Sequence, residues 1–433
     1  MQIRFLVASL AFAAATVATA QERVPFSAER SWEIQRIGGP AISPDGKTVV
    51  AAVTRYDLKD NKGLTDLWLW STDGKVERAL TTNPASDSSP LFSPDGQSLA
   101  FVSQRNGDTA PQLYVMPLAG GEATRVTNVP TGVAQPMWFP DGKRLAFLSR
   151  VWADLDTMDK QAARLKERAD GKSTAQAWDG GPIYYWDTWL DDRQLHVFSV
   201  GVEGGEPVNL TVGTGLELPR SAVQLESPLY DLSPDGKELA FVADSDPASN
   251  VTNNDVYTVA VGGKAATNLT QANPANDGTP LYSPDGRWLA FAQQRTKGFY
   301  GDIRRLMLLD RRGGSVREVV GDAWDRSADG LVWAPDSKRL YGAIDDQGSV
   351  RVYEITLDGK TRRITGDETF ASLAIGEQGG VLVGLRQTFT EPPTVVRIEP
   401  KSGKVTKLSR INDALLAGTA LGTYESVTYT GAD

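Results

Sequence analysis

The chain of 433 residues contains no cysteine and a single histidine, His196. Without cysteine it can form neither disulfides nor reactive thiolates, and one histidine excludes the usual nitrogen and sulfur ligand sets of zinc. The Gly-x-Ser-x-Gly elbow of serine hydrolases is also missing, and the Gly-Gly pairs are placed as hairpin turns rather than phosphate-binding loops. The sequence therefore predicts no metal, no cofactor and no catalytic residues in this chain.

Long apolar runs are absent apart from one at the start of the chain, residues 5–17. A weakly basic start with Arg4 precedes this run, and Ala-Thr-Ala at 18–20 follows it, which is the pattern that signal peptidases cleave. The run is short for a membrane anchor and no basic stop follows it. We therefore expect a signal peptide over 1–20 and a periplasmic or secreted mature protein.

Positive charge is also in deficit. Loss of Arg4 with the signal peptide leaves 44 basic against 54 acidic residues. This balance argues against nucleic acid and anionic membranes as partners.

A short phrase, Ser-Pro-Asp-Gly followed by a charged residue and an apolar strand, recurs along the chain. Its copies, some of them degraded, begin at 43, 93, 139, 233, 283 and 334, and an eroded seventh lies near 375–380. Proline, aspartate and glycine in this order suit a tight turn between antiparallel strands. A second strand pair joined by Gly-Gly or Asp-Gly follows in most units. Four strands per 40 to 50 residues indicate a propeller blade, whereas a β-sandwich with similar turns would not require this period.

The spacing between the copies at 139 and 233 is about one blade too long. Residues 154–168 place Leu155, Met158, Ala162 and Leu165 at helical spacing, and 194–200 with 207–210 then complete the interrupted blade. The sequence thus predicts an all-β, seven-bladed β-propeller over 41–415 with a helical insertion at 150–192 in the third blade. Residues 21–40 would lead into it.

Longer runs at 86–96, 110–115, 185–192 and 213–219 resemble the propeller of bacterial dipeptidyl and acylaminoacyl peptidases of the prolyl oligopeptidase family. The turn phrase alone is less specific, because TolB-type propellers share it. The resemblance implies that an α/β-hydrolase domain with a Ser-Asp-His triad follows the propeller and that 416–433 begin the crossover to it. The chain alone is then expected to be inactive, its role being to admit short peptides to the hydrolase.

One segment is a candidate for peptide binding: Trp178, Tyr184, Tyr185, Trp186 and Trp189 lie within twelve residues. These rings could simply hold the inserted helix on its blade, or they could line the passage to the hydrolase. The resemblance implies that carboxylates would hold the free ammonium of a peptide substrate. The substrate-gating candidates are Tyr184, Trp186, Asp187, Trp189 and Glu217.

Other polar residues suggest no chemistry. We expect His196 to be a packed strand residue, and Asp244, Asp246 and Asp255 to be solvated loop acids because their spacing is not that of an EF-hand. A second interpretation of the whole chain remains open, namely a stand-alone periplasmic propeller that binds a protein partner as TolB does.

Overall fold

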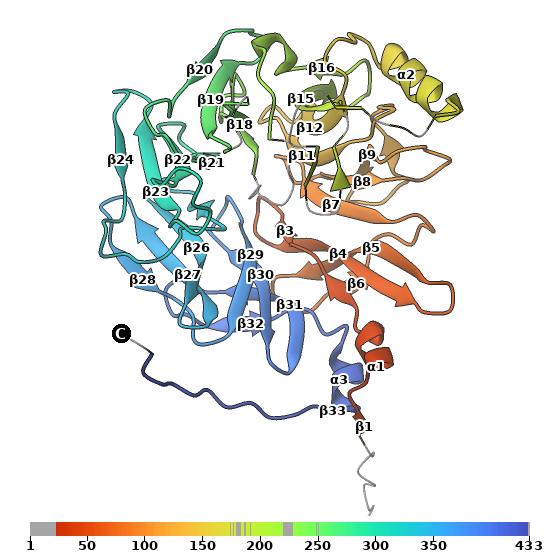
Figure 1. Ribbon diagram of the computed structural model, residues 1–433. Helices are drawn as coiled ribbons and strands as arrows, with labels where there is room; N and C mark the ends of the chain where they lie inside the picture. Colours follow the sequence, from red (N-terminus) through yellow and green to blue (C-terminus); the bar gives the residue numbers. More distant parts are fainter. Residues whose placement is uncertain are drawn as a thin grey trace, which may run out of the picture.

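The computed structural model describes residues 23–431 except 174, 176, 179–182, 186–187, 191, 220–227, 248 and 250. In this part of the chain, seven antiparallel sheets are arranged radially as the blades of a disc (Figure 1). The predicted seven-bladed propeller is confirmed. The predicted signal peptide lies outside the described residues.

Each blade is built from strands that are consecutive in the chain, apart from the insertion in blade three. The strands of blades one to three are β2 (Arg36–Ile37), β3 (Ala41–Ile42), β4 (Thr48–Asp57), β5 (Lys62–Ser71) and β6 (Glu77–Ala79); β7 (Asp87–Phe92), β8 (Ser98–Ser103), β9 (Gln112–Pro117) and β10 (Thr124–Arg125); and β11 (Ala134–Trp138), β12 (Arg144–Val151), β15 (Gln194–Gly201) and β16 (Val208–Asn209).

Blades four to seven follow the same plan. Their strands are β17 (Tyr230–Leu232), β18 (Glu238–Asp244), β19 (Asn254–Ala260) and β20 (Ala266–Asn268); β21 (Asp277–Tyr282), β22 (Trp288–Gln293), β23 (Arg305–Asp310) and β24 (Val316–Glu318); β25 (Val332–Trp333), β26 (Arg339–Asp346), β27 (Ser349–Thr356) and β28 (Thr361–Arg363); and β29 (Thr369–Ile375), β30 (Leu382–Thr388), β31 (Glu391–Ile398) and β32 (Val405–Lys407).

The recurrent turn phrase forms a closed hydrogen-bond unit. In blade two, the Ser93 hydroxyl bonds to Asp95 Oδ1, which also accepts from the backbone N–H of Gln97 at 3.0 Å. The bond from Ser93, followed by that from Gln97, holds the pKa of Asp95 below its usual range. Gly96 has φ +70°, and a Cβ there would lie 3.3 Å from the ring of Pro44 in the preceding blade. The turns of neighbouring blades therefore pack on one another as well as joining strands.

Apolar side chains fill the spaces between neighbouring blades. Between blades one and two, Leu67 and Val50 pack against Phe92, Phe101 and Tyr114, all of them buried. A corresponding cluster joins the first and last blades, and its buried members are Ile37, Val49, Ala51, Val53, Trp70, Val383, Leu385, Val395 and Leu408. The ring is closed by packing, since no sheet combines strands from both ends of the chain within the described blades.

Two segments near the ends of the chain, residues 24–33 and 412–420, meet beside this junction (Figure 1). Strand β1 (Val24–Pro25) pairs in parallel with β33 (Thr419–Ala420), and α1 (Ala28–Glu33) lies near α3 (Asp413–Ala417). Arg30 Nε donates to Thr419 Oγ1 at 3.1 Å. Asn412 bonds the backbone of Gln35 twice, accepting from its N–H at 3.0 Å and donating to its carbonyl at 2.9 Å. Strands β1 and β33, helices α1 and α3 and the contacts of Arg30 and Asn412 are together named the terminal clasp.

The insertion in blade three holds α2 (Met158–Asp170), followed by a hairpin of β13 (Tyr184–Tyr185) and β14 (Thr188–Trp189). The helix was predicted from residue 154, which is wrong by four residues. It begins later because Thr157 caps it, its hydroxyl accepting from Lys160 N at 3.3 Å. A 3-10 turn, η1 (Val212–Thr214), follows the blade. Among the described helices, none has the length and apolar character needed to cross a membrane.

Candidate functional site

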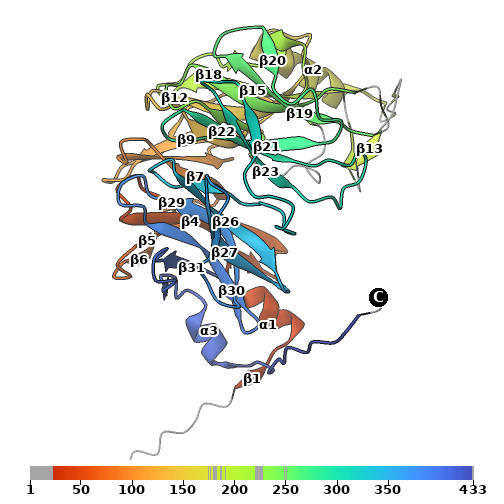
Figure 2. The ribbon, with the colours of Figure 1, turned by 90° about the vertical axis from the view of Figure 1, so that its left-hand side faces the viewer.

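The alternation of strand direction gives the disc two different faces. The Ser-Pro-Asp-Gly turns and the turns between third and fourth strands lie on one face. The turns between second and third strands and the links to the next blade lie on the other. The insertion connects β12 to β15, the second and third strands of its blade, so this second face is named the insertion face. Figure 2 shows β13 and the C-terminal end on the same side of the disc.

Three aromatic rings of the insertion form an exposed cluster on this face. The ring centroids of Trp178 and Trp189 lie 5.5 Å apart, and Tyr184 meets Trp189 edge-on at 5.6 Å. The indole N–H of Trp178 donates to the carbonyl of Leu190 at 2.8 Å. Tyr184 and Trp189 are 55% and 61% exposed. Rings of this size left open to solvent are unusual without a binding role.

The other candidates fall elsewhere. Trp186 and Asp187 lie outside the described residues. Glu217 is half-buried and precedes Leu218, whose backbone bridges to Leu195 in β15. It therefore belongs to the same blade as the aromatic cluster.

A different tryptophan anchors the helix. The backbone of Trp152 donates to Gln161 Oε1 at 3.0 Å, and Gln161 Nε2 donates back to the Trp152 carbonyl at 2.8 Å. The Trp152 indole bonds Asp192 Oδ1 at 2.8 Å, and Arg168 reaches the other oxygen of Asp192 at 2.6 Å. Gln161 is buried within this set. The helix is therefore attached to both ends of the insertion without needing Tyr184 or Trp189.

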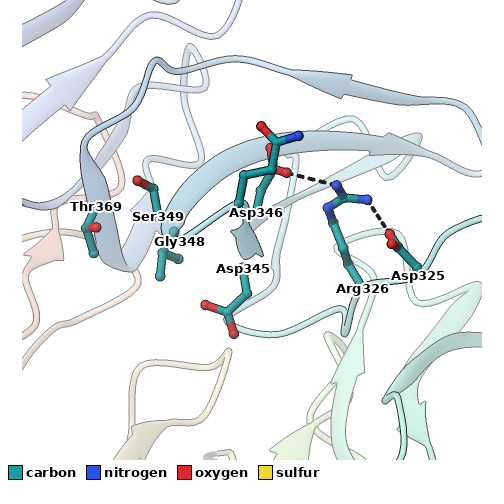
Figure 3. Close-up of a pocket in the computed structure, with 9 residues that line it drawn as sticks. Asp325, Arg326, Asp345, Asp346, Gly348, Ser349 and Thr369 are labelled. Carbon is teal, nitrogen blue, oxygen red and sulfur yellow. Dashed lines mark hydrogen bonds and ion pairs between the residues drawn. The ribbon is translucent and has the colours of Figure 1, made fainter. Parts of the chain in front are cut away.

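A cavity of about 660 Å³ opens beside blade six (Figure 3). Arg326 lies across it and pairs with Asp346 at 2.8 Å and with the exposed Asp325. Asp346 is buried and also bound by Arg351 at 2.7 Å and by the Tyr353 hydroxyl at 2.6 Å. The bond from Tyr353, then those from the two guanidinium groups, holds the pKa of Asp346 well below its usual range. The cavity wall is thus a charge-compensated network.

A second hollow of about 650 Å³ lies between α1 and the β4–β5 turn. Trp32 and Tyr56 meet edge-on at 5.0 Å, and the guanidinium of Arg36 lies 5.3 and 5.1 Å from their centroids. Both hollows went unpredicted because each combines residues from separate turns, which carry no common sequence motif.

Large apolar side chains are exposed in several turns of the insertion face. Besides Tyr184 and Trp189, they are Leu58, Phe299, Tyr300 and Phe389. Phe389 is 80% exposed and stacks on Tyr424 of the C-terminal segment at 4.5 Å. These side chains come from blades one, three, five and seven, each from a turn on the insertion face.

The single histidine is buried, as predicted. His196 is 1% exposed, and its Nδ1 lies 3.0 Å from Thr211 Oγ1. Burial lowers the pKa of His196 to about 4, so the ring is neutral at pH 7. Its other partner is Gln194 at 3.4 Å. This environment lacks the serine partner and the access that a catalytic base needs.

Comparison with known proteins agrees with the β-propeller fold. The family model of the TolB beta propeller domain matches residues 25–211. Dipeptidyl-peptidase 5 of Porphyromonas gingivalis is 27% identical over 88% of this chain and 55% of its own length. Dipeptidyl-peptidase 5 of Aspergillus fumigatus is 25% identical over 86% of this chain and 54% of its own. The chain is thus similar to the TolB beta propeller domain over residues 25–211 and to dipeptidyl-peptidases 5 over most of its length.

Solved structures share the β-propeller fold of this chain. The acylaminoacyl peptidase of Pyrococcus horikoshii has a TM-score of 0.67 at 17% identity, covering 89% of this chain and 55% of that one. The propeller domain of the trilobed protease of Pyrococcus furiosus has a TM-score of 0.60 at 16% identity, covering 88% and 97%. The resemblance predicted from the sequence is confirmed. The chain spans about half the length of the dipeptidyl-peptidases 5 that it matches.

Proposed function

We propose that this propeller is the access-controlling part of an exported serine exopeptidase that acts on short peptides, of the dipeptidyl or acylaminoacyl type. The observation that supports this most is the match to dipeptidyl-peptidases 5 along 86–88% of the chain. The exposed rings of the insertion face support it further, because a hydrolase domain placed there would cover them. Export is proposed from the pattern at residues 1–20.

Access control would be steric and then chemical. A ring closed by packing between all neighbouring blades admits an extended peptide more readily than a folded chain. Tyr184 and Trp189 offer ring faces to a passing peptide. Trp186 and Asp187, which stand between them in the sequence, remain candidates from the sequence alone. Glu217 is half-buried in the same blade. It is the proposed partner of a peptide ammonium, because a carboxylate and an ammonium pair more strongly when partly desolvated than when fully solvated.

The test uses the protein with a hydrolase domain attached and a dipeptidyl p-nitroanilide substrate. We expect Trp189→Ala and Glu217→Gln each to raise KM about five-fold with kcat little changed, the loss of one stacking or charged contact. Val76→Ala, an exposed apolar side chain in the β5–β6 turn on the opposite face of the disc, is the control. Equal KM values for all variants would remove these residues from the proposal, and peptidase activity of residues 21–433 alone would contradict it.

The match to the TolB family model also favours a second function, a stand-alone module that binds a protein partner. The coding sequence beyond Asp433 separates the two. A continuing frame with a Gly-x-Ser-x-Gly elbow supports the peptidase, whereas a stop codon supports the binding module.

A further inference from the structure

Two of the spaces between blades contain a pair of buried carboxyl groups at equivalent positions. Between blades one and two they are Asp66 in β5 and Asp87 in β7. Between blades four and five they are Asp255 in β19 and Asp277 in β21. All four are at most 3% exposed.

The equivalence is visible in the backbone. The residue after the first aspartate donates its N–H to a buried threonine that follows the fourth strand in both blades. Leu67 bonds Thr81 at 2.9 Å, and Val256 bonds Thr270 at 3.0 Å. The second aspartate is the first residue of the next inner strand in both cases. The two spaces can therefore be compared residue by residue.

Arginines compensate the pair between blades one and two. The buried guanidinium of Arg105 is ion-paired with Asp87 and lies about 5 Å from the rings of Phe101 and Tyr114. Arg55 pairs with Asp66 at 3.3 Å. Two positive charges thus face two negative ones.

The pair between blades four and five has no such partner. Arg295, which follows Asp277 at the same interval as Arg105 follows Asp87, pairs instead with Glu318 and Asp322 at the surface. Neutral amides surround the carboxylates: Asn273 and Gln293 each donate to Asp277 at 3.0 Å, and Asn268 donates to Asp255 at 2.6 Å. Among the described residues, no cation pairs with Asp255 or Asp277.

Several oxygens of the segment that enters β19 also lack a partner. The chain entering β19 carries four consecutive side-chain oxygens that are buried and have no hydrogen-bond partner among the described residues: Thr252 Oγ1, Asn253 Oδ1, Asn254 Oδ1 and Asp255 Oδ1. Asn254 and Asp255 are 8% and 2% exposed. Buried acceptors without donors are rare in folded proteins because they lose their water without compensation.

We propose that this oxygen-rich space between blades four and five binds a hard metal cation, best Ca²⁺, with Asp255 as its central ligand. Ca²⁺ takes carboxylate, amide and hydroxyl oxygens in flexible numbers. Asn253 and Asp255, two positions apart on extended chain, lie on the same side of it, and Asp277 lies across the gap. Strand β19, which contains Asp255, packs against β21, which begins with Asp277. A cation there would supply the positive charge that the guanidinium of Arg105 supplies between blades one and two.

This proposal reverses two sequence-based expectations. Asp255 was predicted to be a solvated loop acid, which is wrong because it is the second residue of a buried strand. The sequence also predicted no metal. No group of three histidine, cysteine or acidic residues suited to a metal occurs among the described residues, and the proposed ligand set combines two acids with neutral oxygens instead.

The experiment uses the whole chain, dialysed against a chelator and then supplied with CaCl₂, MgCl₂ or NaCl at equal ionic strength. We expect Ca²⁺ alone to raise the melting temperature, by about 3 °C at a hundredfold excess over Kd. Elemental analysis should find one Ca²⁺ per chain. An equal rise with all three salts, or no bound Ca²⁺, would overturn the proposal.

Matched variants locate the site. Asp255→Asn should weaken Ca²⁺ binding at least tenfold, while Asp66→Asn, the same position beside the compensating arginines, should leave it unchanged. If Asp255→Asn does not fold, Asn253→Ala at a half-buried position serves instead. Equal Ca²⁺ affinities in the wild type, in Asp66→Asn and in the variant tested at the site would contradict the assignment.

Discussion

At the scale of single residues, one buried position in the third strand recurs around the ring with different chemistry. It precedes the residue whose N–H bonds a threonine after the fourth strand, and it is occupied by Asp66, Gln112, His196, Asp255 and Arg351 in blades one, two, three, four and six. All five are at most 4% exposed. The backbone arrangement is thus the same in these blades, and each blade surrounds its own polar group differently. His196 is one of five different polar residues that fill this buried position, so its role is structural.

His196 makes stability depend on pH in a defined window. Its pKa is about 4 in the folded chain, against an ordinary value of 6.5. The unfolded chain therefore binds the proton first as pH falls, and the free energy of unfolding decreases between pH 6.5 and 4, by up to about 3 kcal/mol. His196→Gln, which copies Gln112, should remove this contribution. Urea unfolding of both proteins at pH 7 and 4.5 measures the difference, and parallel pH profiles would contradict the assignment.

The contrast between His196 and Asp255 shows what sequence can decide at this scale. His196 stands among apolar residues of a recognisable strand, so its burial was predictable. Asp255 follows a stretch rich in Asn and Ser, whose composition is that of a solvated loop. Its burial depends on Asp277 of the neighbouring blade and on Asn268 of the adjacent strand. No local sequence pattern predicts such contacts.

At the scale of elements, the insertion also has features that the sequence predicts and features that only the structure shows. The helical spacing predicted α2. It did not predict the hydrogen bonds among Trp152, Gln161 and Asp192 that hold the helix, which we call the clamp, because these residues meet only after the chain has formed the helix and returned to the blade. The aromatic cluster was found from its density of rings. Its separation from the clamp, which leaves Tyr184 and Trp189 exposed, was visible only in the structure.

The clamp can be opened by one substitution. Gln161→Ala removes both bonds to the Trp152 backbone. The buried Trp152 N–H is then unsatisfied, at a cost of about 2 kcal/mol to local stability, while the Trp152 carbonyl keeps its bond from Leu155 N at 3.1 Å. We expect faster hydrogen exchange and proteolysis across α2, with the melting temperature of the propeller little changed. Lys166→Ala, at an exposed position of the same helix, is the control. Protection of α2 equal to that of the wild type would show that the helix is held otherwise.

At the scale of the whole molecule, closure is the property that the repeats leave undecided. Seven similar units predict a ring, and the blades are formed from consecutive strands, so nothing in the repeat pattern says how the first blade meets the last. In the structure, the first and last blades are joined by the apolar cluster around Trp70 and Val395 and by a bond from Gln378 N to the Pro44 carbonyl at 2.8 Å. The terminal clasp joins the same two ends outside the ring.

The terminal clasp should therefore set how easily the ring opens. Asn412 is 6% exposed and bonds Gln35 in both directions. Asn412→Ala should therefore cost about 2 kcal/mol through two lost bonds and the unpaired, partly buried backbone of Gln35. Hydrogen exchange should rise in the first and last blades while blades three to five stay protected, because packing between neighbouring blades is untouched there. Asn128→Ala, at an exposed position in blade two, should change neither. A uniform rise across all blades would mean that the ring unfolds as one unit and that the clasp does not govern its opening.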